Sequence, residues 1–208
     1  RGLGDVYKRQ GNNNASDNTS EQIYMLSLSV PLSGWWGNSY ATYSVSQNDN
    51  SGSSHQLGLS GTALERNNLS WNLMQSYNSH DDEVGGNMSL TYDGTYGTVN
   101  GSYNYSQNSQ RLNYGIRGGI LAHSEGVTLS QELGETIALV KAPGAAGLEI
   151  DNMRGAATDW RGYTVKTQLN PYDENRVAIS DNYFSKSNIE LDNTVVTMVP
   201  TRGAVVKA

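Results

Sequence analysis

The chain has 208 residues, of which 36% are hydrophobic and 16% charged, and its mean hydropathy is −0.57. The formal net charge is −6, and Lys and Arg form no basic stripe, which argues against a nucleic-acid partner. The absence of cysteine excludes disulfides, thiolate metal sites and a cysteine nucleophile.

The opening of the chain differs in character from the rest. Residues 1–10 contain no Met and no apolar stretch, and residues 11–22 are rich in Asn and Ser. We expect residues 1–22 to be a non-native or disordered leader, and the chain to be a fragment of a longer protein.

A period of two dominates residues 23–123, where apolar or aromatic residues alternate with polar ones in about seven segments. Side chains on a strand alternate faces, so each segment is expected to be a strand with one apolar and one polar face. These strands are expected to form regular antiparallel hairpins. The apolar face covers either a protein core or lipid. No run of about 18 apolar residues predicts a transmembrane helix, but a barrel strand needs only about 9–11 residues.

The connections between the predicted strands favour lipid. In chain order they run short (33–38), long (47–54), short (65–68), long (78–86), short (93–94) and medium (106–110). This order is typical of outer-membrane barrels, which have short periplasmic turns and longer external loops. On this interpretation Asp49 and the acidic run 81–83 lie outside the cell, whereas Trp35 and Asn67 lie in the periplasm.

Arg117 falls on the polar face, as a lumen allows, because an Arg facing lipid near mid-bilayer costs roughly 2–4 kcal/mol. The predicted lumen-facing residues are Ser44, Ser60, Ser70, Asn72, Ser89, Thr91, Asn100, Ser102, Asn113 and Arg117. The predicted lipid-facing residues are Leu26, Leu28, Tyr43, Leu59, Trp71, Leu73, Leu90, Tyr103, Tyr114 and Ile116.

The alternation ends after Gly126, and residues 127–208 predict less regular, short strands without an amphipathic helix. The apolar run 137–140 is typical of a strand that is buried on both faces. Further short strands are predicted at 148–152, 163–169, 176–179, 195–199 and 204–206.

No residue pattern predicts catalysis, a cofactor or a metal. His55, His80 and His123 share no spacing, and the acidic run 81–83 lacks the ligand spacing of a calcium loop. The cluster 159–162 (Asp-Trp-Arg-Gly) is interpreted as a turn in preference to a site that stacks a ligand on Trp160. We therefore predict that the protein is not an enzyme.

Several longer segments resemble the fimbrial outer-membrane ushers of the chaperone–usher pathway. The most specific are 134–147 (Gly-Glu-Thr-Ile-Ala-Leu-Val-Lys-Ala-Pro-Gly-Ala-Ala-Gly) and 199–204 (Val-Pro-Thr-Arg-Gly-Ala). Shorter ones are 55–61, 92–101, 158–163 and 175–177, so the resemblance covers about 23–208.

The resemblance implies an all-β fold in which residues 23–208 are part of the C-terminal portion of a large transmembrane barrel. It also implies a multi-pass protein of the bacterial outer membrane. Its partners would be membrane lipid, pilus subunits and periplasmic chaperone–subunit complexes, and the last two would be engaged through the full-length protein. Two alternatives stay open on the residues themselves, a general outer-membrane porin and a soluble all-β adhesin module.

Overall fold

The computed structural model describes residues 23–32, 37–48, 52–180 and 195–208. The predicted leader 1–22, Trp35 and Asp49 lie outside this part. The described residues are all-β, and none of them forms a helix able to cross a membrane. The chain divides into two compact units: residues 1–63, 69–90 and 101–114 form the first, and residues 64–68, 91–100 and 115–208 form the second.

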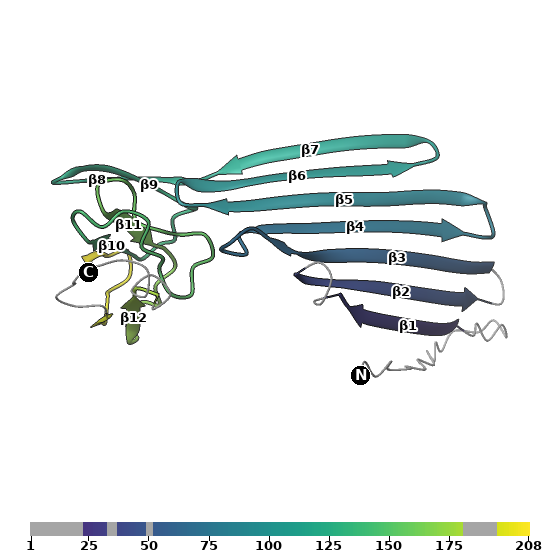
Figure 1. Cartoon of the computed structure of the whole chain (residues 1–208), viewed down its shortest axis with the longest axis horizontal. Coiled ribbons are helices and arrows are strands. Elements are labelled where there is room, and N and C mark those ends of the chain that lie inside the picture. Colours follow the sequence, from purple (N-terminus) through teal and green to yellow (C-terminus); the bar gives the residue numbers. More distant parts are fainter. Residues whose placement is uncertain (1–22, 33–36, 49–51, 181–194) are drawn as a thin grey trace, which may run out of the picture. The chain divides into compact units, whose positions relative to one another are not determined.

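Seven strands form one sheet in sequence order (Figure 1). The alternation of apolar and polar residues suits a pleated sheet, because successive side chains stand on opposite faces. From β1 to β4, each strand pairs antiparallel with its chain neighbours. The seven strands are β1 (Ile23–Pro31), β2 (Asn38–Asn48), β3 (Gly52–Ala63), β4 (Leu69–Asn78), β5 (Glu83–Gly94), β6 (Gly97–Ser106) and β7 (Ser109–Arg117).

The predicted sorting of connections by length is wrong. Within the two segments predicted as long loops, residues 47–48, 52–54, 78 and 83–86 belong to strands, and β6 and β7 likewise extend into 106–110. At the other end, β3 and β4 are separated by residues 64–68, and the turn after β5 is Thr95–Tyr96. The hydrogen bonds between paired strands join backbone groups, whatever the side chains are. A strand can therefore continue through polar residues wherever its neighbouring strand continues too. The N–H of Ser79, for example, donates to the carbonyl of Ser53 at 2.9 Å.

The seventh predicted strand is divided in two. The alternation predicts an unbroken strand through residues 112–122, but β7 ends at Arg117 and β8 (Gly119–His123) pairs with β9 (Gly126–Ser130). The strand thus changes partner, from β6 to β9, at Gly118. A side chain at Gly118 would approach the carbonyl oxygens of Ser130 and Tyr96 at 3.1 and 3.2 Å, so the crossing leaves little room for a larger residue.

The remaining strands belong to other sheets. β10 (Ile137–Lys141) lies between β11 (Tyr163–Lys166) and β14 (Val205–Lys207), antiparallel to the first and parallel to the second. β12 (Asn175–Ala178) pairs with β13 (Val195–Met198). Residues 148–152, predicted as a strand, contribute only isolated bridges.

The core of the second unit explains this arrangement. Burial of β10 on both faces is confirmed: Ala138 and Val140 pack with Leu148 and Val177, whereas Leu139 packs on the opposite side with Val165. Segment 127–208 was expected to supply further barrel strands. In its described part, apolar side chains between Ile137 and Ile179 form a core of their own, because a strand that is apolar on both faces needs cover on both.

Candidate functional site

The polar face of the sheet is the candidate site, and the strand register defines it in β1–β4. Residues directly opposite on antiparallel strands share a face. Ser60 lies opposite Asn72, and Ser70 lies opposite Thr62. Ser44 pairs with Gln56, which in turn pairs with Ser76. Ser44, Ser60, Ser70 and Asn72 therefore share one face.

Side-chain contacts extend this face across β5–β7. Asn113 Nδ2 donates to Ser102 Oγ at 3.3 Å, and Asn87 Nδ2 donates to Asn104 Oδ1 at 2.5 Å. A side chain at Gly115 would meet the amide of Asn100. The alternation within each strand places Ser89 and Thr91 with Asn87, and Arg117 with Asn113. The ten predicted lumen residues thus follow one face of each strand; that this face lines a lumen stays a prediction.

The polar face also carries a few apolar side chains that the alternation does not explain. Tyr40 pairs with Ser60, and Met74 pairs with Gly58. Both are exposed. Hydroxyl and amide groups nevertheless prevail on this face, and they are short hydrogen-bonding groups without charge.

The opposite face is apolar and open to its surroundings. Tyr43 lies between Leu28 and Leu57, and Leu59 lies opposite Leu73. In β6, the Tyr103 and Tyr105 rings stack with centroids 6.2 Å apart. Eight of the ten predicted lipid-facing residues are exposed, and Leu59 and Trp71 are half-buried. So large an apolar surface in water is unusual for a soluble monomer.

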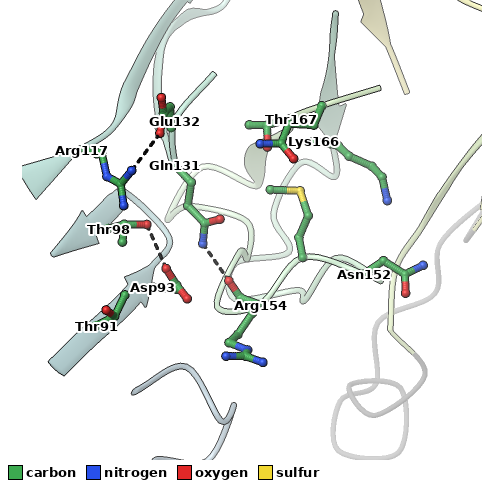
Figure 2. Close-up of a pocket in the computed structure, with 12 residues that line it drawn as sticks. Thr91, Asp93, Thr98, Arg117, Gln131, Glu132, Asn152, Arg154, Lys166 and Thr167 are labelled. Atoms are coloured by element: carbon green, nitrogen blue, oxygen red, sulfur yellow. Dashed lines mark hydrogen bonds and ion pairs between the residues drawn. The ribbon is translucent and has the colours of Figure 1, made fainter. Parts of the chain in front are cut away.

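Within the second unit, the polar strand ends border a pocket of about 480 Å³ (Figure 2). Arg117 Nη1 lies 3.6 Å from Glu132 Oε2, and Thr98 Oγ1 donates to Asp93 Oδ1 at 3.0 Å. The pocket is lined by Thr91, Asp93, Thr98, Arg117, Gln131, Glu132, Asn152, Met153, Arg154, Lys166, Thr167 and Gln168.

Lys166 brings a partly buried charge to this pocket. Its Nζ donates to the Asp151 carbonyl at 3.0 Å, and burial lowers the pKa of its ammonium group. Gln131 Nε2 donates to the carbonyl of Arg154 at 2.7 Å and to that of Gly94 at 3.2 Å. Cationic, anionic and amide side chains all line the pocket. This mixture suits hydrated polar groups better than a ligand of one charge.

The three histidines lie apart. The His55 ring lies between the rings of Tyr43 and Tyr77, with a centroid-to-centroid distance of 6.3 Å to each. His55 Nδ1 also forms a hydrogen bond with the Tyr43 hydroxyl at 2.8 Å. His80 belongs to the turn between β4 and β5. His123 Nε2 is 2.9 Å from Thr128 Oγ1, and its side chain is only 6% exposed, a burial that its sequence position did not suggest. No metal-binding group of side chains is present in the described ranges.

Residues 159–162 form a turn, as predicted. The Asp159 carboxylate accepts the backbone N–H groups of Arg161 at 2.8 Å and Tyr163 at 2.9 Å. Trp160 itself is 78% exposed and does not anchor the turn in the core. The buried aspartate holds the turn because it satisfies backbone donors.

A family profile and several related proteins match nearly the whole chain. Residues 6–208 match the profile of the Usher family, described as "Outer membrane usher protein". The outer membrane usher protein FimD of Escherichia coli K12 is 41% identical over 206 residues, which cover 94% of this chain and 23% of FimD. LpfC of Salmonella typhimurium is 40% identical, covering 91% of this chain and 22% of LpfC. The F1 capsule-anchoring protein of Yersinia pestis is 36% identical, covering 97% and 24%.

A solved structure has the same fold. The cryo-EM structure of the E. coli P pilus tip assembly intermediate PapC–PapD–PapK–PapG contains a chain that matches with a TM-score of 0.68 and 21% identity, over 92% of this chain and 23% of that one. The all-β, antiparallel fold predicted for the chain is thereby confirmed as that of part of a large transmembrane barrel. The chain spans about a quarter of the length of the relatives it matches, and it belongs to the outer membrane usher protein family.

Proposed function

We propose that this chain forms part of the pore wall of a bacterial outer-membrane usher, a multi-pass protein that translocates and assembles chaperone-delivered pilus subunits. The observation that carries the proposal is a seven-stranded sheet with one polar and one apolar face in a chain of the usher family. The PapC relative was solved together with PapD, PapK and PapG as a pilus tip assembly intermediate, which supports subunits and chaperone as partners.

The polar face suits the passage of a folded, hydrated subunit. Ser, Thr and Asn side chains exchange hydrogen bonds with water and with a passing surface at similar energy, so no position holds the cargo tightly. A lumen lined by this face would therefore bind a passing subunit only weakly. Assembly of this kind exchanges non-covalent contacts and requires no bond chemistry or cofactor.

The apolar face suits lipid. Apolar residues occupy alternate positions along the strands, and most of those predicted to face lipid are exposed, as on the outer surface of a barrel. Examples are Leu28, Leu73, Tyr114 and Ile116. Exposing apolar surface to water costs about 25 cal/mol per Å², so a face of this size is costly in water. A hydrocarbon environment removes that cost.

A general porin would share the two-faced sheet but not the family match over residues 6–208, and a soluble adhesin would share neither the match nor the open apolar face. The test uses the full-length parent. We expect it to float with outer-membrane vesicles and to migrate faster on gels before heating than after. We also expect a strain without it to lose its pili. A parent that stays soluble without detergent, or unchanged piliation in the deletion strain, would contradict the proposal.

A further inference from the structure

The β8–β9 hairpin has two contrasting faces. Ile120 lies opposite Leu129, and Ala122 lies opposite Val127. All four are exposed, Ile120 to 71%, Val127 to 51% and Leu129 to 44%. None is polar. We call these four residues the hairpin's apolar face.

The other face of the hairpin is fixed to the second unit. Leu121 packs against the cluster that contains Leu139 and Tyr163, and Thr128 is buried. The His123 ring lies 5.2 Å from the Tyr163 ring. The apolar face is therefore held outward by packing behind it, and no described residue is packed on it as part of a core cluster.

Aromatic and basic residues lie at the edge and tip of the hairpin. Arg161 and Lys141 also lie over the Tyr163 ring behind it, 5.4 and 6.0 Å from its centroid. The Arg161 guanidinium donates to the backbone carbonyls of Glu125, at 3.4 Å, and Val127, and it lies 5.6 Å from the Trp160 ring centroid. At the hairpin tip, Lys141 and Lys207 lie 3.2 and 4.0 Å from the Glu125 carboxylate. Trp160, 78% exposed, is the kind of side chain that proteins place at the level of lipid headgroups, because its ring is amphipathic. Arg161 is paired with Asp159 at 3.4 Å, as the two lysines are with Glu125.

The apolar face also continues an alternation that begins in β7. Ile116, 80% exposed, belongs to the same compact unit, and the same parity passes through Gly118 to Ile120 and Ala122. The alternation of apolar and polar residues therefore continues across Gly118, where the strand changes its partner. Ile116 is among the residues proposed above to face lipid, and within the second unit the hairpin continues its apolar positions.

We propose that the hairpin's apolar face lies in the lipid–water interface of the membrane, with the exposed Trp160 at headgroup level. The inference rests on the proposed function, because it takes β1–β7 to span the bilayer. The occupant is phospholipid. Apolar faces of this kind enter the boundary of headgroups and acyl chains to a depth of about 5–10 Å.

The test places one environment-sensitive label on the full-length parent in phospholipid nanodiscs. This chain has no cysteine, so Val127→Cys, in a parent with any other cysteines replaced, accepts a single NBD group. We expect blue-shifted emission, and quenching by nitroxide-labelled lipids at least half that at Leu73→Cys. The matched control is Glu174→Cys, exposed in a loop of the same unit, which we expect to stay unquenched.

The two positions separate failure of this inference from failure of the proposed function. Quenching at Leu73→Cys without quenching at Val127→Cys overturns the hairpin contact and leaves the barrel face intact. So does an emission change at Val127→Cys that requires an added chaperone–subunit complex, which would make the face a protein-docking surface. Loss of quenching at both positions overturns both proposals.

Discussion

Neighbouring residues of β4 offer the sharpest test of the two faces, because Leu73 pairs with Leu59 and Asn72 pairs with Ser60. An arginine at Leu73 would point into lipid, at a cost of about 2–4 kcal/mol near mid-bilayer, whereas an arginine at Asn72 would point into water. We expect Leu73→Arg to abolish or strongly reduce heat-modifiable barrel in the outer membrane, and Asn72→Arg to preserve it. Equal damage from both would contradict the assignment of the apolar face to lipid and the polar face to water.

A glycine in the second unit supports a different prediction. Gly162 has φ +87°, and a side chain there would collide with the carbonyl of Ala142. Gly144 has a similar φ of +79° but open space around it. Gly144→Ala therefore costs only the left-handed backbone, about 1–2 kcal/mol, whereas Gly162→Ala must also displace backbone. We expect Gly162→Ala to expose residues 137–179 to limited proteolysis well before Gly144→Ala does. Equal protection of the two variants would argue against the turn geometry.

Among the elements, the tip of the β8–β9 hairpin predicts a dependence on pH. Hydrogen bonds from Ser124, His123 and Lys141 lower the pKa of the Glu125 carboxyl from its ordinary 4.5 to about 2. The same contact with Glu125 raises the pKa of Lys141. A carboxyl whose pKa is lower in the folded state stabilises that state above its unfolded pKa and ceases to do so as the pH falls through its folded pKa.

The second unit should therefore lose stability between pH 4.5 and about 2 through Glu125. Glu125→Gln should flatten this part of the profile of thermal unfolding against pH, and Glu174→Gln should leave it unchanged. A wild-type profile that Glu125→Gln does not alter in this range would show that the contacts at the tip are too weak to matter.

Elements also show where local pattern stops being informative. The period of two in residues such as Leu57, Leu59 and Leu73 is a property of each strand alone, so the strands and their faces were predictable from sequence. The ends of the strands were not, because Ser53 and Ser79 continue the ladder only when their partners are in place. Most described residues of the predicted long loops consequently belong to strands. Gly118 likewise separates β7 from β8 only because β9 is available as a second partner.

For the whole molecule, the open edges of the sheet predict how the isolated chain behaves. Among the described strands, β1 pairs only with β2, and β7 pairs only with β6. On its other side, each of the two strands pairs with no described strand, and the apolar face adds a surface that water solvates poorly. We expect the 208-residue chain, expressed alone, to aggregate in buffer and to be recovered only with detergent. A monodisperse soluble monomer would contradict the membrane assignment of the sheet.

Sequence by itself determined that the chain is all-β, that residues 23–117 alternate between a polar and an apolar face, and that β10 is buried on both sides, because each of these follows from spacing over a few residues. Tertiary structure alone decided that β10–β14 lie in sheets separate from β1–β7, that the His123 side chain is buried beside Tyr163, and that the β8–β9 hairpin turns four apolar side chains outward. These features depend on which distant segments pair and pack, and pairing between distant segments leaves no local period in the chain.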